Sequence, residues 1–300
     1  MPFAAIIRSM LALALLPLAL HSQSRPARSD FARPRISVGH TPAGLVNGSP
    51  CLFRVQSAPP LKDLAGVFLG RRVFFNFDAS TGTWYGLAGA GIDTPPGPHS
   101  LTLESTLLTG GRFSSVHSIT IDRAKYRAAE LAVPSRFTAP DAAARARIKA
   151  ERAIKSAAFR RVSRERHWSG RFAAPVDDIV TEPFGVARIF NGVLQSTHQG
   201  VDYRAATGTP VLAMNGGRVL LAREMFHEGG FLVLDHGQGL LSLHMHLSRI
   251  DVREGDRVAK GQIVARSGEN GRATGPHLHA GVRWQGLYLD LATLLKMELP

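Results

Sequence analysis

The chain has 300 residues, a formal net charge of +13 and one cysteine. This length allows two modest domains, each with its own core, and the near-zero mean hydropathy argues against a membrane protein. Because Cys51 is alone, neither an intramolecular disulfide nor a zinc cluster of thiolates can form. We expect its side chain to lie buried in a strand.

The N-terminus is typical of a secretion signal. Met10–Leu20 is an unbroken apolar run of eleven residues, which is short for a membrane span but suits the middle of a signal peptide. Ser22 and Ser24 offer cleavage points after it. We therefore expect a signal peptide at residues 1–24, export to the periplasm, cell wall or extracellular space, and no membrane span in the mature chain. The alternative is a membrane anchor that is retained.

Basic residues gather in the middle of the chain, where the stretch from Arg123 to Arg171 holds 14 Lys/Arg against 4 Asp/Glu. A basic protein can bind nucleic acid, an anionic membrane or an anionic wall polymer. The secretion signal and the lack of an aromatic–basic sequence motif argue against nucleic acid. Electrostatic contact with an anionic wall polymer remains as an expectation, and a solvated helix face would explain the charges equally well.

Residues 25–34 are polar, contain two prolines and are expected to form a linker. Between residues 35 and 125, short alternating segments are separated by turn signals such as Asn47-Gly48 and Gly66. Short strands at this spacing indicate a small β-sandwich. The expected strands are Arg35–Val38, Pro50–Gln56, Arg72–Phe77, Thr83–Leu87, Ser100–Glu104 and Ser118–Ile121.

Residues 126–170 are expected to form a basic helical connector. Ala, Arg, Lys and Glu dominate residues 140–162, where Asp141 suits a helix N-cap and the sparse apolar positions are Ile148, Ala153 and Ile154. Strands and glycine turns then return, before a short terminal helix at Leu291–Met297. We therefore expect a mainly β protein, with an antiparallel domain at 171–300 that follows the sandwich and the connector.

Histidines concentrate near the C-terminus, where seven of the twelve lie between His198 and His279. Residues two apart in a strand point to the same face. Each of two His-x-His pairs can therefore direct both rings into one groove. One such pair is more often structural than functional, but three elements within about eighty residues indicate a metal site. The three elements are His198 with Asp202, His244 with His246, and His277 with His279.

The chemistry of these side chains favours a catalytic metal over a structural one. Three nitrogen or oxygen ligands and one open position are what a catalytic zinc needs, whereas a closed site usually includes cysteine. Zinc held in this way lowers the pKa of its water to about 7 and polarises a carbonyl. Further imidazoles could transfer protons or stabilise an oxyanion. Spacing alone does not separate the ligands from the other histidines.

The sequence around these residues resembles the lysostaphin-type, or LytM-domain, zinc metallo-endopeptidases of the bacterial cell wall. The resemblance covers about 110 residues in the family's order and spacing. A looser resemblance upstream is to exported members with an immunoglobulin-like domain before the peptidase. The matching motifs are Phe184-Gly185, His198-x-Gly-x-Asp202, Gly208-Thr-Pro-Val211, Gly217-x-Val219, Asp235-His-Gly237, His246-Leu-Ser248, Val252-x-x-Gly-Asp-x-Val258, Lys260-Gly-Gln262 and Thr274-Gly-Pro-His-Leu-His279.

This resemblance implies a zinc-dependent endopeptidase that hydrolyses the peptide cross-links of peptidoglycan, with one Zn²⁺ per chain and a metal-bound water as nucleophile. His198, Asp202 and His279 stand at the three ligand positions of the family. His246 and His277 stand at the positions of its two catalytic histidines. One of these would help to deprotonate the water, and the other would stabilise the intermediate or protonate the leaving amine.

Two other histidines are expected to be structural. His244 stands where the family usually has an aromatic residue, often Tyr, and is expected to pack within a strand. His236 matches a turn position and is expected to stabilise that turn by hydrogen bonds.

The alternative to an enzyme is a non-enzymatic module that binds the wall or regulates other hydrolases and retains a metal site. Such proteins tend to lose at least one of the five site residues, and all five are present in this sequence. The sequence does not indicate whether a D-Ala–diaminopimelate bond, a Gly–Gly bond or another bond is cut, because specificity depends on groove walls and loops. It does not indicate the oligomeric state.

Overall fold

A computed structural model describes residues 34–108, 110–131, 140–190 and 193–300. The expected signal peptide at 1–24 and residues 25–33 of the expected linker lie outside the described residues. Pro34–Pro300 forms one compact unit, which is mainly β, as the sequence predicts. Among the described residues, no helix has the length and apolar character needed to cross a bilayer.

The N-terminal module contains seven strands, and antiparallel pairing joins them in the order β1-β2-β5-β4-β3-β6-β7. β4 pairs with β5 through Phe75–Asp78 and with β3 through Arg71–Phe74, so it links the two parts of this sheet. All six expected strand segments lie within observed strands. The bounds are β1 (Arg35–Thr41), β2 (Pro50–Ala58), β3 (Ala65–Phe68), β4 (Arg71–Asp78), β5 (Thr83–Gly89), β6 (Gly97–Thr106) and β7 (Arg112–Ile121).

The strand β3 is not among the expected ones, because its Gly66 is a turn signal in the sequence. That interpretation is wrong, since Gly66 lies within the strand. A Cβ at this position would lie 2.8 Å from Cε2 of Phe75, so the glycine allows a close approach of an aromatic ring. Cys51 is fully buried in β2, as expected, and burial raises the pKa of its thiol.

The connector contains the helix α2 (Ala142–Phe159). Asp141 is its N-cap, as predicted, and accepts a hydrogen bond from the backbone N–H of Ala144 at 2.8 Å. The buried contact of the helix is made by a residue outside the three sparse apolar positions that the sequence shows. Ala158 is buried against the C-terminal domain, whereas Ile154 is 36% exposed.

Polar side chains also fasten α2 to the C-terminal domain. Glu151 accepts a hydrogen bond from the backbone N–H of Phe226 at 2.9 Å, and Lys155 forms an ion pair with Glu228. Both partners lie in the turn between β14 and β15. The connector helix therefore supports one wall of the region described below as the candidate site.

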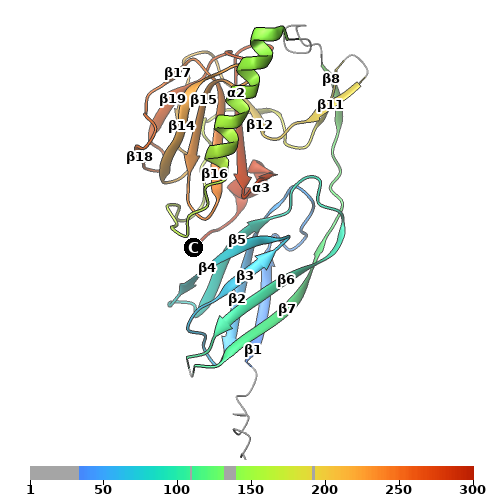
Figure 1. The fold of residues 1–300 in the computed structure, drawn as a ribbon, viewed down its shortest axis with the longest axis vertical. Helices are drawn as coiled ribbons and strands as arrows, with labels where there is room; N and C mark the ends of the chain where they lie inside the picture. The colour runs from blue at the N-terminus through green and yellow to red at the C-terminus, as the bar shows by residue number, and fades with distance from the viewer. Residues whose placement is uncertain (1–33, 109, 132–139, 191–192) are drawn as a thin grey trace, which may run out of the picture. The chain divides into compact units, whose positions relative to one another are not determined.

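The C-terminal domain (Figure 1) is built around a large antiparallel sheet. The strand order is β18-β14-β15-β16-β20-β12-β9, with β21 paired to β20. A smaller sheet, β13-β19-β17, contributes Val211 and Val264 to the core that contains Leu232 and Leu278 of the large sheet. The bounds are β9 (Val180–Glu182), β12 (Val201–Arg204), β13 (Pro210–Leu212), β14 (Gly217–Met225), β15 (Gly229–Asp235), β16 (Leu240–Leu247), β17 (Arg249–Ile250), β18 (Arg257–Val258), β19 (Ile263–Arg266), β20 (His277–Trp284) and β21 (Leu287–Leu289).

Between β9 and β12 in the sequence, β10 (Ala187–Phe190) and β11 (Val193–Thr197) form an antiparallel hairpin. β8 (Ala128–Leu131) pairs with β10 in parallel. The short helix α3 (Leu291–Lys296) matches the expected terminal helix. The backbone N–H of Asp290 donates to the Gly48 carbonyl at 2.7 Å, which ties the C-terminal domain to the N-terminal module. The domain boundaries at 125/126 and 170/171 remain predictions.

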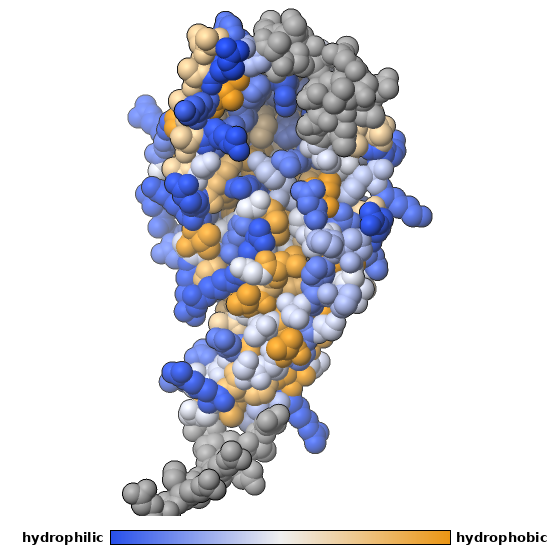
Figure 2. Space-filling view, turned by 45° about the vertical axis from the view of Figure 1, so that its right-hand side comes forward, coloured by the Kyte–Doolittle hydropathy of each residue, from blue (hydrophilic) through white to orange (hydrophobic). Residues whose placement is uncertain are grey.

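The surface shown in Figure 2 is largely hydrophilic, and its apolar side chains lie in small scattered patches. Extended apolar patches mark many protein interfaces. On this face the apolar patches are interspersed with polar side chains and do not form one extended apolar surface.

Candidate metal centre

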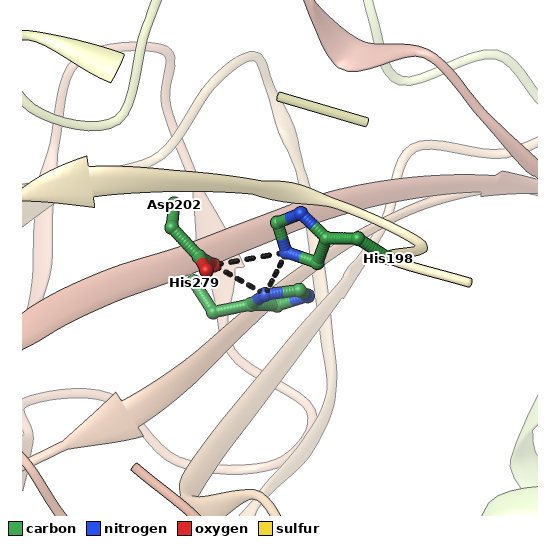
Figure 3. A group of neighbouring side chains, drawn as sticks. All are labelled: His198, Asp202 and His279. Atoms are coloured by element: carbon green, nitrogen blue, oxygen red, sulfur yellow. Dashed lines mark hydrogen bonds and ion pairs between the residues drawn. The ribbon is translucent and has the colours of Figure 1, made fainter. Parts of the chain in front are cut away.

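Three side chains converge on one point beside the large sheet (Figure 3). Nε2 of His198 lies 3.0 Å from Oδ1 of Asp202 and 3.0 Å from Nδ1 of His279. Nδ1 of His279 lies 2.7 Å from the same Asp202 oxygen. All three residues are largely buried. The structure therefore brings together the three residues that we expected to be metal ligands.

Strand pairing explains why these residues meet. β12 pairs with β20 so that Asp202 lies directly opposite His279, and side chains of directly opposed residues are close neighbours. His198 lies just before β12, four residues ahead of Asp202. His277 lies two residues before His279 on β20 and therefore points to the same face.

A hydrogen bond orients the ring of His198, and a glycine leaves room for the ring of His279. Nδ1 of His198 donates to the Pro183 carbonyl at 2.9 Å. A carbonyl can only accept, so Nε2 of His198 keeps a lone pair directed at the centre. His279 directs its other nitrogen, Nδ1, at the centre. Gly200 leaves room for this ring, because a Cβ there would lie 2.5 Å from Nε2 of His279 and 2.7 Å from the Ala280 carbonyl.

Asp202 is held as a carboxylate. Burial would raise its pKa, but the adjacent imidazoles of His198 and His279 outweigh burial and lower the pKa well below its usual range. Its second oxygen, Oδ2, accepts a hydrogen bond from Nη2 of Arg188 at 3.0 Å. Oδ1 therefore faces the histidines while Oδ2 faces the arginine.

The three donors fit a zinc ion. Neutral imidazole nitrogens and a carboxylate oxygen are ligands that zinc accepts. Tetrahedral bonds of about 2.0–2.2 Å place the donor atoms about 3.4 Å apart, and the donors lie 2.7–3.0 Å apart. Small outward movements of the side chains would reach that spacing. Within the described part of the chain the group contains three such residues, one fewer than a closed structural site uses.

The two histidines expected to be catalytic flank this group. The ring centroids of His246 and His277 lie 4.7 Å apart, and those of His246 and His279 lie 6.1 Å apart. Nδ1 of each flanking ring donates to a backbone carbonyl at 2.8 Å, of Asn270 and of Gly275 respectively. Nε2 is therefore the unprotonated nitrogen of each neutral ring. Burial lowers the pKa of His246 to about 3, so this ring is neutral at neutral pH.

His246 reaches the site because β16 contains a bulge. The pairing of β15 with β16 shifts its register in the stretch that holds His246, and this leaves one extra residue on β16. The backbone φ of His246 is +63°, in the left-handed region that non-glycine residues rarely adopt. The extra residue turns His246 to the same side as Met245, away from His244. The expectation that His244 and His246 share one groove is therefore wrong.

His244 instead lies opposite Leu232 of β15 and Ala280 of β20, which both belong to the core that contains Leu278, and it is a packing residue there. It is fully buried, and neither ring nitrogen makes a hydrogen bond of normal geometry to a described residue. Burial lowers its pKa to about 3. His236 is structural, as expected: its two ring nitrogens bond to the Gly216 carbonyl at 2.7 Å and to Oγ of Ser242 at 2.8 Å.

A cavity of about 340 Å³ opens over the group. It is lined by both candidate histidine ligands and by His246, together with three residues that sequence interpretation missed, Arg188, His227 and Arg272. No motif includes these three, and their nearness to the motif residues in the sequence is the only signal that could have found them. A larger cavity of about 600 Å³, lined mainly by strands of the N-terminal module, contains none of the five expected site residues.

Comparisons with known proteins agree with the location of this site. Residues 196–291 match the sequence model of Peptidase family M23. The peptidoglycan DD-endopeptidase ShyA of Vibrio cholerae is 40% identical over 82 residues, which are 27% of this chain and 19% of ShyA. The glycyl-glycine endopeptidase ALE-1 of Staphylococcus capitis is 40% identical over 90 residues, which are 29% of this chain and 25% of ALE-1. The chain thus spans about a fifth to a quarter of the length of these relatives.

A solved structure extends the similarity beyond this region. A crystal structure from Pseudomonas aeruginosa, assigned to the M23 peptidases, has 28% sequence identity and a TM-score of 0.65. It covers 83% of this chain and 94% of that one. The shared fold therefore includes strands that precede the matched region.

Proposed function

We propose that this chain, which carries a domain of peptidase family M23 at residues 196–291, is a zinc-dependent endopeptidase that hydrolyses peptide cross-links of bacterial peptidoglycan. The convergence of His198, Asp202 and His279 on one point, beside His246 and His277, is the observation that carries the proposal. Relatives named as peptidoglycan and glycyl-glycine endopeptidases support a cell-wall peptide as the substrate.

His198, Asp202 and His279 would hold one Zn²⁺ per chain. When bound, the ion would polarise the scissile carbonyl and increase the acidity of a water molecule. The Pro183 carbonyl fixes the ring of His198, and Arg188 fixes the second oxygen of Asp202. Such outer contacts orient metal ligands and keep them in the correct protonation state.

His246 and His277 would carry the protons of the reaction. In the neutral form of each ring, Nε2 has the lone pair beside the ligand group, because Nδ1 donates to a backbone carbonyl. A neutral Nε2 can accept the proton of the attacking water, and the resulting imidazolium can donate it to the leaving nitrogen. A protonated ring can also hydrogen-bond to the developing oxyanion. We assign these roles to the two histidines as a pair.

The proposal extends to location and partners. A wall substrate requires an exported enzyme, in the periplasm or at the cell surface, which agrees with the expected signal peptide at 1–24. Anionic wall polymer is the proposed electrostatic partner of the basic connector. A non-enzymatic module with a relic metal site is disfavoured, because all five site residues are present and lie together.

Incubation of the purified protein with isolated peptidoglycan tests the function. Zinc-loaded protein should release soluble peptides, a chelator should stop the release, and added Zn²⁺ should restore it. Mass analysis of the fragments names the bond that is cut. Zinc-loaded protein that releases no fragment from walls of several cross-link types would overturn the proposal.

A further inference from the structure

A charged groove continues from the metal centre toward α2. The cavity over the centre and a second cavity of about 580 Å³ share Glu228, Met245 and Tyr288 in their linings. The second cavity runs along α2, where Phe159 forms part of its wall. A substrate peptide bound at the metal centre and extending in this direction would pass along both cavities.

Cations outnumber carboxylates in this groove. The two linings together contain six Lys or Arg side chains and two carboxylates. Clustered like charges with low-dielectric walls raise the local concentration of a ligand of opposite charge. The cations are Arg152, Lys155, Arg160, Arg188, Arg272 and Arg283, and the carboxylates are Asp93 and Glu228.

Several of these charges are neutralised within the protein. Arg188 is ion-paired with Glu182 and Asp202, and Lys155 is ion-paired with Glu228. Arg272 differs, because it makes no ion pair with any residue that the structure describes; the residue is exposed, although partial burial lowers the pKa of its guanidinium. It is therefore the cation beside the metal centre that is available to a ligand.

Arg283, in the second cavity, is also unsatisfied. Its guanidinium lies 4.4 Å from the ring centroid of Phe159 and 5.5 Å from that of Tyr288. Nε and Nη1 are buried and lack hydrogen-bond partners among the described residues. These two atoms are closed to a ligand, so the exposed Arg152 and Arg160 are the cations of this cavity that an anionic group can reach.

The backbone holds Arg272 in a fixed place. Its N–H donates to the His227 carbonyl at 2.8 Å. Gly271, before it, has a φ of +78° and packs so tightly that a Cβ would lie 2.3 Å from the backbone nitrogen of Gly229. The carbonyl of Asn270 accepts the hydrogen bond that orients His246. The loop that fixes His246 therefore also fixes the cation.

We propose that Arg272 binds a free carboxylate of the substrate next to the scissile bond, and that the cavity along α2 takes further acidic groups. This inference rests on the proposed function and names its substrate class: anionic wall peptides are selected over neutral ones such as oligoglycine bridges. Arginine suits this role, because its planar guanidinium binds a carboxylate through two parallel hydrogen bonds.

A pair of synthetic cross-linked peptide dimers tests the subsite. The two dimers differ only in a free carboxylate or a carboxamide on the residue that follows the scissile bond. The zinc-loaded full chain should cleave the carboxylate form with a kcat/KM about 10- to 100-fold higher. Arg272→Gln should remove this preference, and Arg272→Lys should keep part of it. Arg253→Gln, at an exposed position outside both cavities, is the matched control and should keep all of it.

Binding without turnover separates this inference from the function on which it rests. In a His246→Ala background, calorimetry should show tighter binding of the carboxylate dimer, and Arg272→Gln should abolish the difference. Equal cleavage of both dimers by the wild type, or an equal loss on both in Arg272→Gln, would overturn the carboxylate subsite and leave the peptidase intact. If neither dimer is cleaved, the assay on isolated walls decides the peptidase proposal, and the binding preference still decides the role of Arg272.

Discussion

Nη2 of Arg188 donates a hydrogen bond to Oδ2 of Asp202 at 3.0 Å, on the oxygen that faces away from the two histidines. Nε of the same guanidinium donates to Oε2 of Glu182 at 2.9 Å, and this oxygen lies 3.1 Å from Nδ1 of His198. One arginine thus contacts Asp202 directly and also contacts the carboxylate that lies beside His198. It holds the carboxylate so that Oδ1 is the oxygen directed at the metal position.

Removing this arginine should weaken metal binding without removing a ligand. Arg188→Gln leaves Oδ2 of Asp202 without its charged partner, so the carboxylate can rotate. We expect zinc affinity to fall about 10- to 100-fold, as for other outer-shell contacts, in a competition titration with a chromophoric chelator. Arg223→Gln, which breaks an exposed ion pair with Glu254, is the control. Equal zinc affinity in both variants would contradict the positioning role.

Substitution of a candidate ligand should lower the zinc content of the protein, whereas substitution of a flanking histidine should lower only its turnover. His279→Ala removes a donor atom from the centre, so the purified variant should contain little zinc and show no turnover. His246→Ala keeps all three donors, so it should retain zinc while its turnover falls by a factor of about 10² or more. Elemental analysis and wall hydrolysis measure the two properties. Equal loss of zinc from both variants would show that the division of roles is wrong.

Strand pairing and the alternation of side chains along a strand explain why the sequence could predict these site residues. Asp202 and His279 are 77 residues apart in the chain, yet they lie opposite each other because their strands pair. His277 and His279 share a face because a strand alternates with a period of two. These regularities, with the family motifs, were sufficient to select five residues that the structure places together.

What the sequence did not predict depends on departures from regularity. A bulge separates His246 from His244, and one extra residue in a strand has no signature in an apolar–polar pattern. The contact of Arg188 with Asp202 depends on how the β10–β11 hairpin packs, which no local pattern specifies. Gly66 serves close packing under Phe75, although glycine more often signals a turn.

Gly200 should be essential for the centre although it carries no side chain. In Gly200→Ala the new Cβ would lie 2.5 Å from Nε2 of His279 and 2.7 Å from the Ala280 carbonyl, and the strand carbonyl cannot easily move. We expect the ring to be displaced, with loss of zinc and a decrease in stability of about 1–3 kcal/mol. Gly44→Ala, where a Cβ would meet nothing within 4 Å, should leave zinc content unchanged. A Gly200→Ala variant that binds zinc normally would count against this account.

The buried His244 should lower the free energy of unfolding. Its ring is fully buried without a normal hydrogen bond to a described residue, and an unsatisfied buried polar group costs about 1–3 kcal/mol. We expect His244→Phe to increase the free energy of unfolding in urea by about 1 kcal/mol at pH 7.5. His244→Leu checks whether the larger ring is overpacked. Destabilisation by both substitutions would indicate that the imidazole makes a favourable contact.

The same residue should make stability depend on pH. Burial lowers the pKa of folded His244 to about 3, whereas an unfolded histidine titrates near 6.5. Above pH 6.5 the ring is neutral in both states, so stability does not change through this group. As the pH falls from 6.5 toward 3, the unfolded chain takes up a proton that the folded chain does not, and stability falls by about 1.4 kcal/mol per unit. His244→Phe removes this contribution. Its advantage over the wild type, with metal removed from both, should therefore be about 2 kcal/mol larger at pH 5.0 than at pH 7.5. An advantage that stays constant between these pH values would mean that the ring gains access to water or a proton acceptor in the folded protein.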